Sequence, residues 1–316
     1  MAVSNVKNFL SLQDKVLTKM MRDYTAPTLN GADALFPKVS VLTEEITIPK
    51  FTSKESLKIY NNLLRAPYSN SNTLQPGQID SDSFTLHEYD ICWPLDWRVE
   101  KAASGIVNLR RRATMKVAEI LQVNREYLAA TLATTASNYD AANKEALATT
   151  TCWSDTANST PISDIDDAMT AIRAATGYLP NVLVLSLIAF NLIKRHPTVT
   201  ALLPNNIMAL ITEGDLSKIF GIPNVIVAPS YYVNDANVVT DMWGDNVVLA
   251  YVNQAKGADR SPDNHSFGYT FEMDGFPSID VWTKDDKKTS YCRATVVQDV
   301  AILDNDYGFL ISNTQA

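Results

Sequence analysis

The chain has 316 residues, of which 46% are hydrophobic and 20% are charged, and its formal net charge at pH 7 is −8. This length allows one large domain or two ordinary ones with a sizeable core. The acidic balance argues against a protein whose main task is to grip nucleic acid, because such proteins usually carry a basic patch and a high pI. The sequence shows neither a run of ~18 to 20 apolar residues nor a secretory signal, so we expect a protein made in the cytosol with no membrane contact.

The first 36 residues predict a short helix followed by a loop. Apolar side chains recur at helical spacing from Val6 to Leu17, and Pro27 and Gly31 mark the loop. A segment of this size has too little apolar surface to fold alone. We therefore expect an arm that lies against another part of the structure.

The segment after the arm predicts two extended runs separated by a long polar stretch. Val39 and Val41 alternate with polar residues, and Ile46 and Ile48 continue on the other parity, which predicts a bulge near residues 44–45. Roughly thirty-five mostly polar residues then precede the partner run, and a structureless stretch of that size is uncommon inside a compact domain. We expect a long hairpin that projects from the body and contacts another molecule.

The strongest local signal is that of a long helix. Apolar residues recur at steps of three and four from Val99 to Leu132 without a proline. The pattern predicts one helix of ~35 residues, roughly 50 Å long, which would act as a spine joining distant parts of the fold. Three consecutive arginines, residues 110–112, lie within it, and the pattern favours a solvated or salt-bridged face over a phosphate contact.

Residues 162 to about 260 predict a compact unit of alternating helices and strands, preceded by a strand at 145–153. Ser163 or Asp164 can cap a first helix that ends at Gly177. Ser186 caps the next helix, which Pro197 stops.

A third helix in this unit follows from Thr212 and Asp215, which have the spacing of a capping box, and it ends at Gly221. The expected core strands are residues 181–185, 224–228 and 246–252.

The last fifty residues or so return to the strand pattern. Three or four antiparallel strands are expected, with residues 285–288 (DDKK) as a tight charged turn. The runs are residues 269–276, 278–284, 290–303 and 307–312.

The order of these parts resembles the Hong Kong 97-type phage capsid fold, and the local text is similar to that of a major capsid protein. The similar text is WSD before PISDIDDAMTAIRAATGYLPNVLVLS, then TEGDLSKIFGIPNVIVAPSYY and WGDNVVLAYV. The arrangement covers nearly the whole chain, and the textual similarity is concentrated in residues 153–252.

The resemblance implies an α+β fold with the domains of that family. They are an N-terminal arm (1–36), an E-loop hairpin (37–95), the spine helix and start of the P-domain (96–160), an axial A-domain (161–260), and C-terminal strands of the P-domain with the chain end (261–316).

The resemblance also implies the function of a structural coat protein, not an enzyme. Copies of the chain would assemble into hexamers and pentamers of an icosahedral shell around packaged phage DNA, in the host cytoplasm, and remain in the virion capsid. The implied partners are other copies and non-specific contacts with the DNA; a separate scaffolding protein, a portal and decoration proteins stay open. A covalent crosslink through Lys50, Lys54 or Lys58 is the less favoured alternative to uncrosslinked subunits.

Two apolar sets are expected to form the contacts between subunits. The hairpin would bury its set on the adjacent subunit, and the loop around residues 202–211 would pack about the local rotation axes. A buried helix within the domain is an equal alternative for that loop. The candidate contact residues are Phe51, Leu57, Ile59, Tyr60, Leu202, Leu203, Ile207 and Met208.

Patterns for catalysis or cofactor binding are weak. The sequence has no GxGxxG, GxxxxGK[ST] or GxSxG motif. The three histidines share no metal-ligand spacing, and His196, before Pro197, is expected to contact carbonyls at a helix end. Cys92, Cys152 and Cys292 lie far apart and are expected to be buried, reduced thiols. We therefore expect no catalytic residue, cofactor or metal.

Three competing interpretations remain. An encapsulin-type nanocompartment shares the fold and would hold protein cargo. A cytosolic α/β hydrolase or ligand-binding protein could be built around residues 162–260. The third alternative is a tail protein or another structural protein of the virion.

Overall fold

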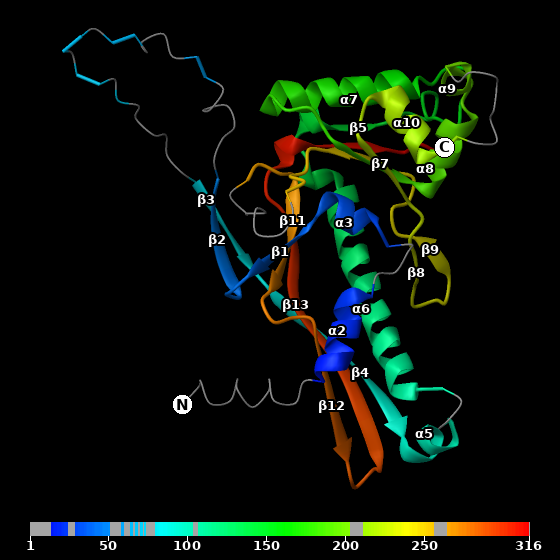
Figure 1. The fold of residues 1–316 in the computed structure, drawn as a ribbon. Helices are drawn as coiled ribbons and strands as arrows, with labels where there is room; N and C mark the ends of the chain where they lie inside the picture. Colours follow the sequence, from blue (N-terminus) through cyan, green and yellow to red (C-terminus); the bar gives the residue numbers. More distant parts are fainter. Residues whose placement is uncertain are drawn as a thin grey trace.

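The computed structural model describes residues 14–24, 29–50, 80–103, 107–202, 211–255 and 264–315, together with a few residues between 58 and 73. Within these ranges the body consists of two five-stranded sheets connected by one long helix, α6 (Figure 1). A two-stranded ribbon, β2–β3, projects away from this body. The protein therefore mixes helices and sheets as the sequence predicts.

The first sheet is organised around β13, which at 14 residues is far longer than an average strand. Residues 289–295 of β13 pair with β12 and residues 298–302 pair with β11, while β4 runs antiparallel along residues 289–298. β1 adds to the outside of β11 in parallel. The strands are β1 (Lys38–Val41), β4 (His87–Asp96), β11 (Gly268–Met273), β12 (Ser278–Lys284) and β13 (Thr289–Ile302).

Most C-terminal strand predictions are confirmed by this sheet. β11, β12 and β13 form where the alternation predicted them, and the predicted turn is present, with the Lys288 N–H donating to the Asp285 carbonyl at 3.3 Å. The strand predicted at 307–312 is also present, but it lies in the other sheet. Sequence alternation identifies a strand without identifying its partner, because the pairing is made between residues far apart in the chain.

The second sheet has the order β5–β14–β10–β6–β7. β6 pairs with β7 in parallel and with β10 in antiparallel orientation, and β14 connects β10 to the edge strand β5. The strands are β5 (Lys144–Ala146), β6 (Val182–Ser186), β7 (Asn224–Ala228), β10 (Val247–Ala250) and β14 (Gly308–Ser312). The prediction of a strand over 145–153 is therefore wrong beyond Ala146, since the following residues form turns that bury Cys152 and Trp153.

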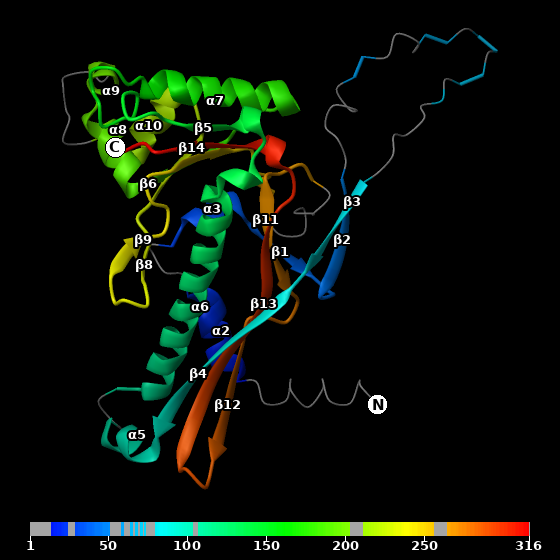
Figure 2. The same cartoon turned by 180° about the vertical axis from the view of Figure 1, so that it is seen from behind.

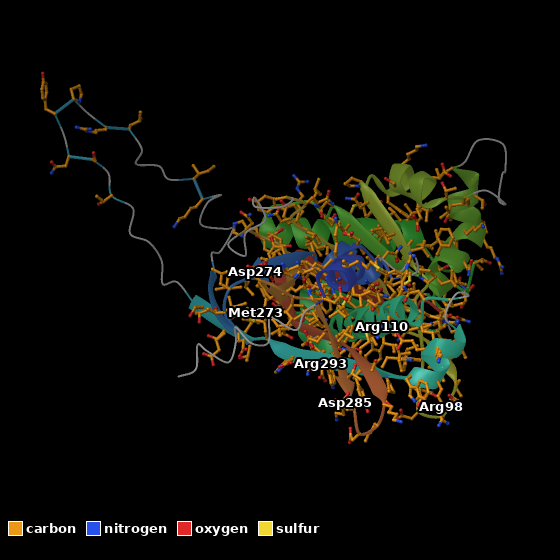
Figure 3. The ribbon with its side chains drawn as sticks, turned by 60° about the horizontal axis from the view of Figure 1, so that its bottom comes forward. Arg98, Arg110, Met273, Asp274, Asp285 and Arg293 are labelled. Atoms are coloured by element: carbon orange, nitrogen blue, oxygen red, sulfur yellow. The ribbon has the colours of Figure 1, made fainter. Side chains whose placement is uncertain are left out.

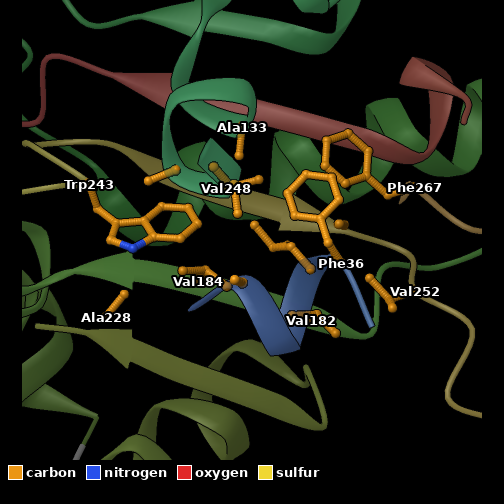
Figure 4. Packing of buried hydrophobic residues seen from close by; sticks show 14 of the residues in the cluster. Phe36, Ala133, Val182, Val184, Ala228, Trp243, Val248, Val252 and Phe267 are labelled. Atoms are coloured by element: carbon orange, nitrogen blue, oxygen red, sulfur yellow. The ribbon is translucent and has the colours of Figure 1, made fainter. Parts of the chain in front are cut away.

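Both faces of the second sheet are covered. Leu183 and Leu249 point to one face, where α7 (Pro161–Thr176), α8 (Leu187–Arg195), α9 (Pro197–Ala201) and α10 (Glu213–Phe220) pack. Val184 and Val248 point to the other face, against α3 (Gly31–Leu35), the end of α6 (Leu109–Thr134), Phe36, Trp243 and Phe267 (Figure 4). Since both faces are buried, the strands are continuous apolar runs rather than alternating ones.

The local capping signals are largely confirmed. The Ser186 side chain accepts a hydrogen bond from the Ala189 N–H, and Thr212 with Asp215 forms the predicted capping box. Gly177 and Gly221 end their helices in the left-handed region, with φ of 82° and 68°. The first helix starts earlier than predicted, at Pro161, because proline fits the first turn of a helix.

The prediction of a single spine helix of ~35 residues is wrong in the length of the helix. The structure has a short helix α5 (Trp97–Ala103) and then α6, a helix of 26 residues whose N-cap is Asn108. The Asn108 side chain accepts a hydrogen bond from the Arg111 N–H at 3.1 Å and so defines a new helix start.

The shorter helix α6 still joins distant parts of the fold, as the helical pattern predicts. Ala113, Val117 and Leu121 pack against the first sheet and the helix α2 (Lys15–Asp23). Ala129 and Ala133, in the last two turns of α6, pack against the second sheet. One continuous helix therefore takes part in both cores.

The predicted bulge near residues 44–45 is also wrong. Residues 42–44 form a bend at which the chain leaves the first sheet and enters β2 (Glu45–Lys50). β2 pairs antiparallel with β3 (Asp80–Thr85), from Glu45 opposite Thr85 to Lys50 opposite Asp80. The base of this ribbon is anchored by Phe84, whose ring lies 5.7 Å from that of Phe271.

Replacing Leu183, which is fully buried in β6, by alanine should lower the free energy of unfolding by about 2 to 5 kcal/mol, because the lost methyl groups leave a cavity in the core. Urea unfolding of the unassembled chain measures this. The matched control is Leu179→Ala, at a site that is 60% exposed, where we expect a change of less than about 0.5 kcal/mol. Equal effects of the two substitutions would contradict the proposed position of β6 in the core.

Candidate functional site

A buried carboxylate in the middle of α6 connects the N-terminal region to the rest of the molecule. Glu126 Oε1 accepts hydrogen bonds from the Gly31 N–H at 3.1 Å, the Trp243 indole at 3.0 Å and the Ser230 hydroxyl at 3.2 Å. Its Oε2 accepts from the Ala32 N–H at 2.9 Å. Burial raises the pKa of the Glu126 carboxyl, and the hydrogen bonds from Ala32 and Trp243 oppose the rise. The four donors come from three separate parts of the chain.

The preceding residue, Arg125, holds the same N-terminal helix from its other end. Its guanidinium lies 2.7 Å from the Asp33 carboxylate and donates to the Phe36 carbonyl at 3.2 Å. Its Nε donates to the Thr270 hydroxyl of β11 at 3.4 Å. Arg125 and Glu126 therefore clamp α3 between α6 and the first sheet, and we refer to this group as the α3 clamp.

The glycine at the start of α3 makes the clamp possible. A Cβ atom at residue 31 would overlap the Trp243 indole and come within 2.8 Å of Glu126 Oε1. The backbone of α3 can approach the carboxylate only because this side chain is missing. The predicted arm is thus held by specific contacts within its own chain from Gly31 onward.

The upstream helix α2 is held in a similar way against the first sheet. The Asp14 N–H donates to the Ile279 carbonyl, and the Ile279 N–H donates to the Thr18 hydroxyl at 3.1 Å. Arg22 donates to the carbonyls of Gly275 and Pro277. The described part of the arm therefore lies along its own subunit.

His196 is buried in a network of hydroxyl groups, so the prediction of a cation facing helix carbonyls is wrong. Ser159 donates its proton to the Asp155 carbonyl, so its oxygen accepts from His196 Nε2 at 2.9 Å. On the other side of the ring, Nδ1 lies 2.7 Å from the Thr198 hydroxyl. Burial lowers the pKa of His196, and the nearby Asp164 carboxylate opposes this. The imidazole is therefore a neutral structural group that joins residues 155–159 to α9.

Of the contact residues predicted on the hairpin, the structure describes Ile59, which lies in the chain between β2 and β3. Ile59 is 87% exposed, and its neighbour in the same segment, Leu64, is 94% exposed. The predicted contacts Phe51, Leu57 and Tyr60 lie outside the described residues. The structure thus shows apolar side chains beyond the ribbon that their own subunit leaves uncovered.

Leu202 is the described member of the second predicted set, and it is 60% exposed at the end of α9. Leu203, Ile207 and Met208 lie outside the described residues. The predicted axial loop and its alternative, a buried helix, both concern residues after Leu202, so both stay predictions.

A second exposed ribbon was missed by the sequence reasoning. β8 (Tyr231–Val233) and β9 (Val239–Asp241) form a two-stranded ribbon beside α6, where the Tyr232 ring lies 4.9 Å from that of Tyr127 (Figure 2). Its outer residues Tyr231 and Val239 are 56% and 63% exposed. The turn signal NDAN between two apolar runs could have predicted it.

The described residues were compared with the requirements of a metal ion and of a membrane crossing. Over the ranges given above, no group of three or more His, Cys, Asp or Glu side chains is placed to hold a metal ion. Among the same residues, no helix has the length and apolar character that a membrane crossing requires. Cys152 and Cys292 are buried free thiols as predicted, whereas Cys92 is exposed on β4.

Comparison with known proteins gives consistent matches. Residues 112–261 match the family described as phage major capsid protein E. The chain is 34% identical over 304 residues to the major capsid protein of Burkholderia phage BcepMu, covering 96% of this chain and 97% of that protein.

Two solved structures share the fold. A phage-related protein from Bordetella bronchiseptica RB50 is similar with a TM-score of 0.77 and 25% identity, covering 96% of this chain and 97% of that one. The capsid of Myoviridae phage XM1 is similar with a TM-score of 0.53 and 14% identity, covering 92% and 94% of the two chains.

The chain belongs to the phage major capsid proteins, structural subunits that form the capsid shell of a virion from copies of themselves. This result confirms the predicted family and favours it over an encapsulin-type compartment. It also favours a capsid protein over a hydrolase, a ligand-binding protein or a tail protein.

Replacing Glu126 by alanine should lower the free energy of unfolding by about 3 to 5 kcal/mol, because four buried donors lose their acceptor at once. Urea unfolding measures the loss. We also expect faster tryptic cleavage at Lys38, because α3 is no longer held. The control is Glu119→Ala on the same helix, which removes an exposed ion pair with Lys116 and should cost at most about 0.5 kcal/mol. Unchanged stability and cleavage in the Glu126 variant would show that the clamp is unimportant.

Acidification should destabilise the protein through His196. Its folded-state pKa lies below the ordinary 6.5, so below about pH 6.5 the unfolded chain binds a proton that the folded chain resists. Stability present above that pH is therefore lost as the pH falls. His196→Asn should cost about 1 to 3 kcal/mol at neutral pH, and the remaining stability should decline less than that of the wild type between about pH 7.5 and 5.5.

The matched control for this pH effect is His87→Asn, at an exposed site on β4. We expect it to keep the stability of the wild type at neutral pH within about 0.5 kcal/mol. Identical pH dependence of the His196 variant and the wild type would assign the acid sensitivity to other groups.

Proposed function

We propose that this capsid subunit has the Hong Kong 97-type arrangement and forms hexamers and pentamers of an icosahedral shell around packaged DNA. In this proposal residues 1–36 are the N-arm, α6 is the spine helix, and β2–β3 is the base of the E-loop hairpin. The sheet around β13 belongs to the P-domain. The sheet around β6 belongs to the A-domain, which then includes β5 and β14 in addition to residues 161–260.

The observation that most strongly supports the proposed arrangement is the β2–β3 ribbon, which projects from the body of the subunit. β2 and β3 contact the rest of the subunit at their base, where Ile48 is buried, while Ile59 and Leu64 farther along are almost fully exposed. An isolated two-stranded ribbon is at best marginally stable in water and gains stability when a further surface covers it. In a shell made of copies of one chain, the adjacent subunit supplies that surface.

The end of the second sheet supports contacts about the rotation axes of the capsomer. Leu202 is exposed at the end of α9, and the segment that follows it is apolar in sequence. Solvent-facing loops are usually polar, so this composition favours a contact between copies. Leu203, Ile207 and Met208 are the residues of this segment that we propose for the contact.

The proposal also includes the place of assembly and the partners of the subunit. Subunits would assemble in the host cytoplasm, where the free thiols of all three cysteines fit a reducing environment. A scaffolding protein, a portal and decoration proteins are compatible partners, and the packaged DNA is contacted without sequence preference.

Shortening the hairpin by deleting residues 66–79 should abolish regular particles while the subunit still folds, because the ribbon base and both cores remain intact. Ile59→Asp should weaken assembly in the same direction by placing a charge in an apolar contact. Electron microscopy and sedimentation of the expressed protein measure particle formation, and urea unfolding confirms the fold.

The matched control for Ile59→Asp is Thr283→Asp, an exposed position on β12 far from the ribbon, which should leave particle formation unchanged. Regular particles from both hairpin variants would overturn the proposed hairpin contact.

A further inference from the structure

The end of the molecule farthest from the second sheet carries a dense group of positive charges. Residues 96–116 contain six arginines and lysines but two acidic residues, in a chain whose net charge is −8. Two of them, Arg98 and Arg110, are labelled in Figure 3. We call this group the basic patch; its members are Arg98, Lys101, Arg110, Arg111, Arg112 and Lys116, all exposed.

Pairing within the subunit accounts for only part of this charge. Arg110 lies 2.7 Å from Glu100, and Lys116 lies 2.8 Å from Glu119. Within the described part of the chain, Lys101, Arg111 and Arg112 form no ion pair. These three cations are therefore solvated in the isolated subunit and available to an external anion.

The stability of α6 does not explain the position of these cations. Arg110, Arg111 and Arg112 occupy the first turn of α6, where the helix dipole already presents positive charge and further cations are unfavourable. The Asn108 cap uses the backbone N–H of Arg111 and none of the three guanidinium groups. The charges are thus placed against the preference of the helix, which points to a role outside the subunit.

The surroundings extend the positive surface. The turn between β12 and β13 approaches α5, where the Trp97 N–H donates to the Lys288 carbonyl at 3.2 Å. This turn carries Lys287 and Lys288 beside Asp285 and Asp286. On the other side, Arg112 and Lys116 border a groove of about 440 Å³ with an apolar floor of Trp93, Val99 and Leu109.

We propose that the basic patch is the surface through which each shell subunit contacts the phosphate backbone of the packaged double-stranded DNA. This rests on the proposed function, in which the shell encloses DNA. Consecutive helical residues point about 100° apart, so Arg111 and Arg112 suit a ligand that presents charges along a line more than a single carboxylate. Duplex DNA presents one negative charge per roughly 1.7 Å of its axis.

The test is DNA binding by the unassembled full-length chain. The probe is a fluorescent duplex of about 30 base pairs, titrated at several salt concentrations between about 50 and 200 mM. The patch variant combines Lys101→Gln, Arg111→Gln and Arg112→Gln. The matched control removes the same charge at the opposite end of the molecule, on α8 and α10, with Lys194→Gln, Arg195→Gln and Lys218→Gln.

Each phosphate contact contributes about 0.9 to the slope of log K against log salt, so the patch variant should lose about 2 to 3 from that slope. Its affinity at the lowest salt should fall roughly tenfold or more, while the control stays within about twofold of the wild type. Equal binding by the patch variant and the control would overturn the proposal, as would a wild type that binds no DNA.

Particle formation by the same variants separates this proposal from the proposed function. Normal particles from the patch variant, together with weakened DNA binding, support a surface that faces the DNA. Loss of particles with unchanged DNA binding would overturn the proposal and make the patch a contact between copies. A wild-type chain that never forms particles would count against the shell proposal, while the binding measurement still decides on the patch.

Discussion

The arrangement of this subunit depends on one buried carboxylate. Glu126 sits in the middle of α6, away from water, and a carboxylate in that position is tolerated only when donors surround it. Gly31 and Ala32 of α3 and the Trp243 indole supply those donors, so the arm and the loop before β10 must meet at this point of the helix. The requirement to satisfy one charge thereby positions elements that are about a hundred residues apart in the chain.

The rest of the body follows from the length of α6 and the small side chains that it buries. Ala113 and Val117 let the first sheet approach one half of the helix, and Ala129 and Ala133 let the second sheet approach the other. Because both cores share one rigid helix, the two sheets are held in a defined relation within the subunit. The β2–β3 and β8–β9 ribbons contact the body through Ile48 and Tyr232, while Tyr231 and Val239 of the second ribbon remain exposed.

Structural features that depend on a few neighbouring residues could be predicted from the sequence. Features that depend on contacts between residues far apart in the chain could not. The capping box of Thr212 and Asp215 was found because both members lie within one helical turn. The break before α6 was missed because the apolar repeat continues across it, although Asn108 was a usable signal. The role of Glu126 was missed because an acidic residue within a helix usually faces solvent, and its partners come from elsewhere in the chain. The contact residues around Ile59 and Leu202 were predicted because their segments are apolar in sequence. Apolar composition does not identify the surface on another copy that these residues would contact.

The basic patch shows why the net charge of the whole chain says little about a particular surface. A value of −8 describes the sum over the whole chain, whose 35 acidic residues are spread along its length. Charges separated by more than roughly 8 Å in physiological salt are largely screened from one another, so a local group of cations acts independently of distant acids. In the proposed shell, a subunit has to avoid binding nucleic acid tightly during assembly and yet lie close to the packaged DNA afterwards. Low overall affinity combined with a local cationic surface meets both requirements, whereas a uniformly basic protein would meet only the second.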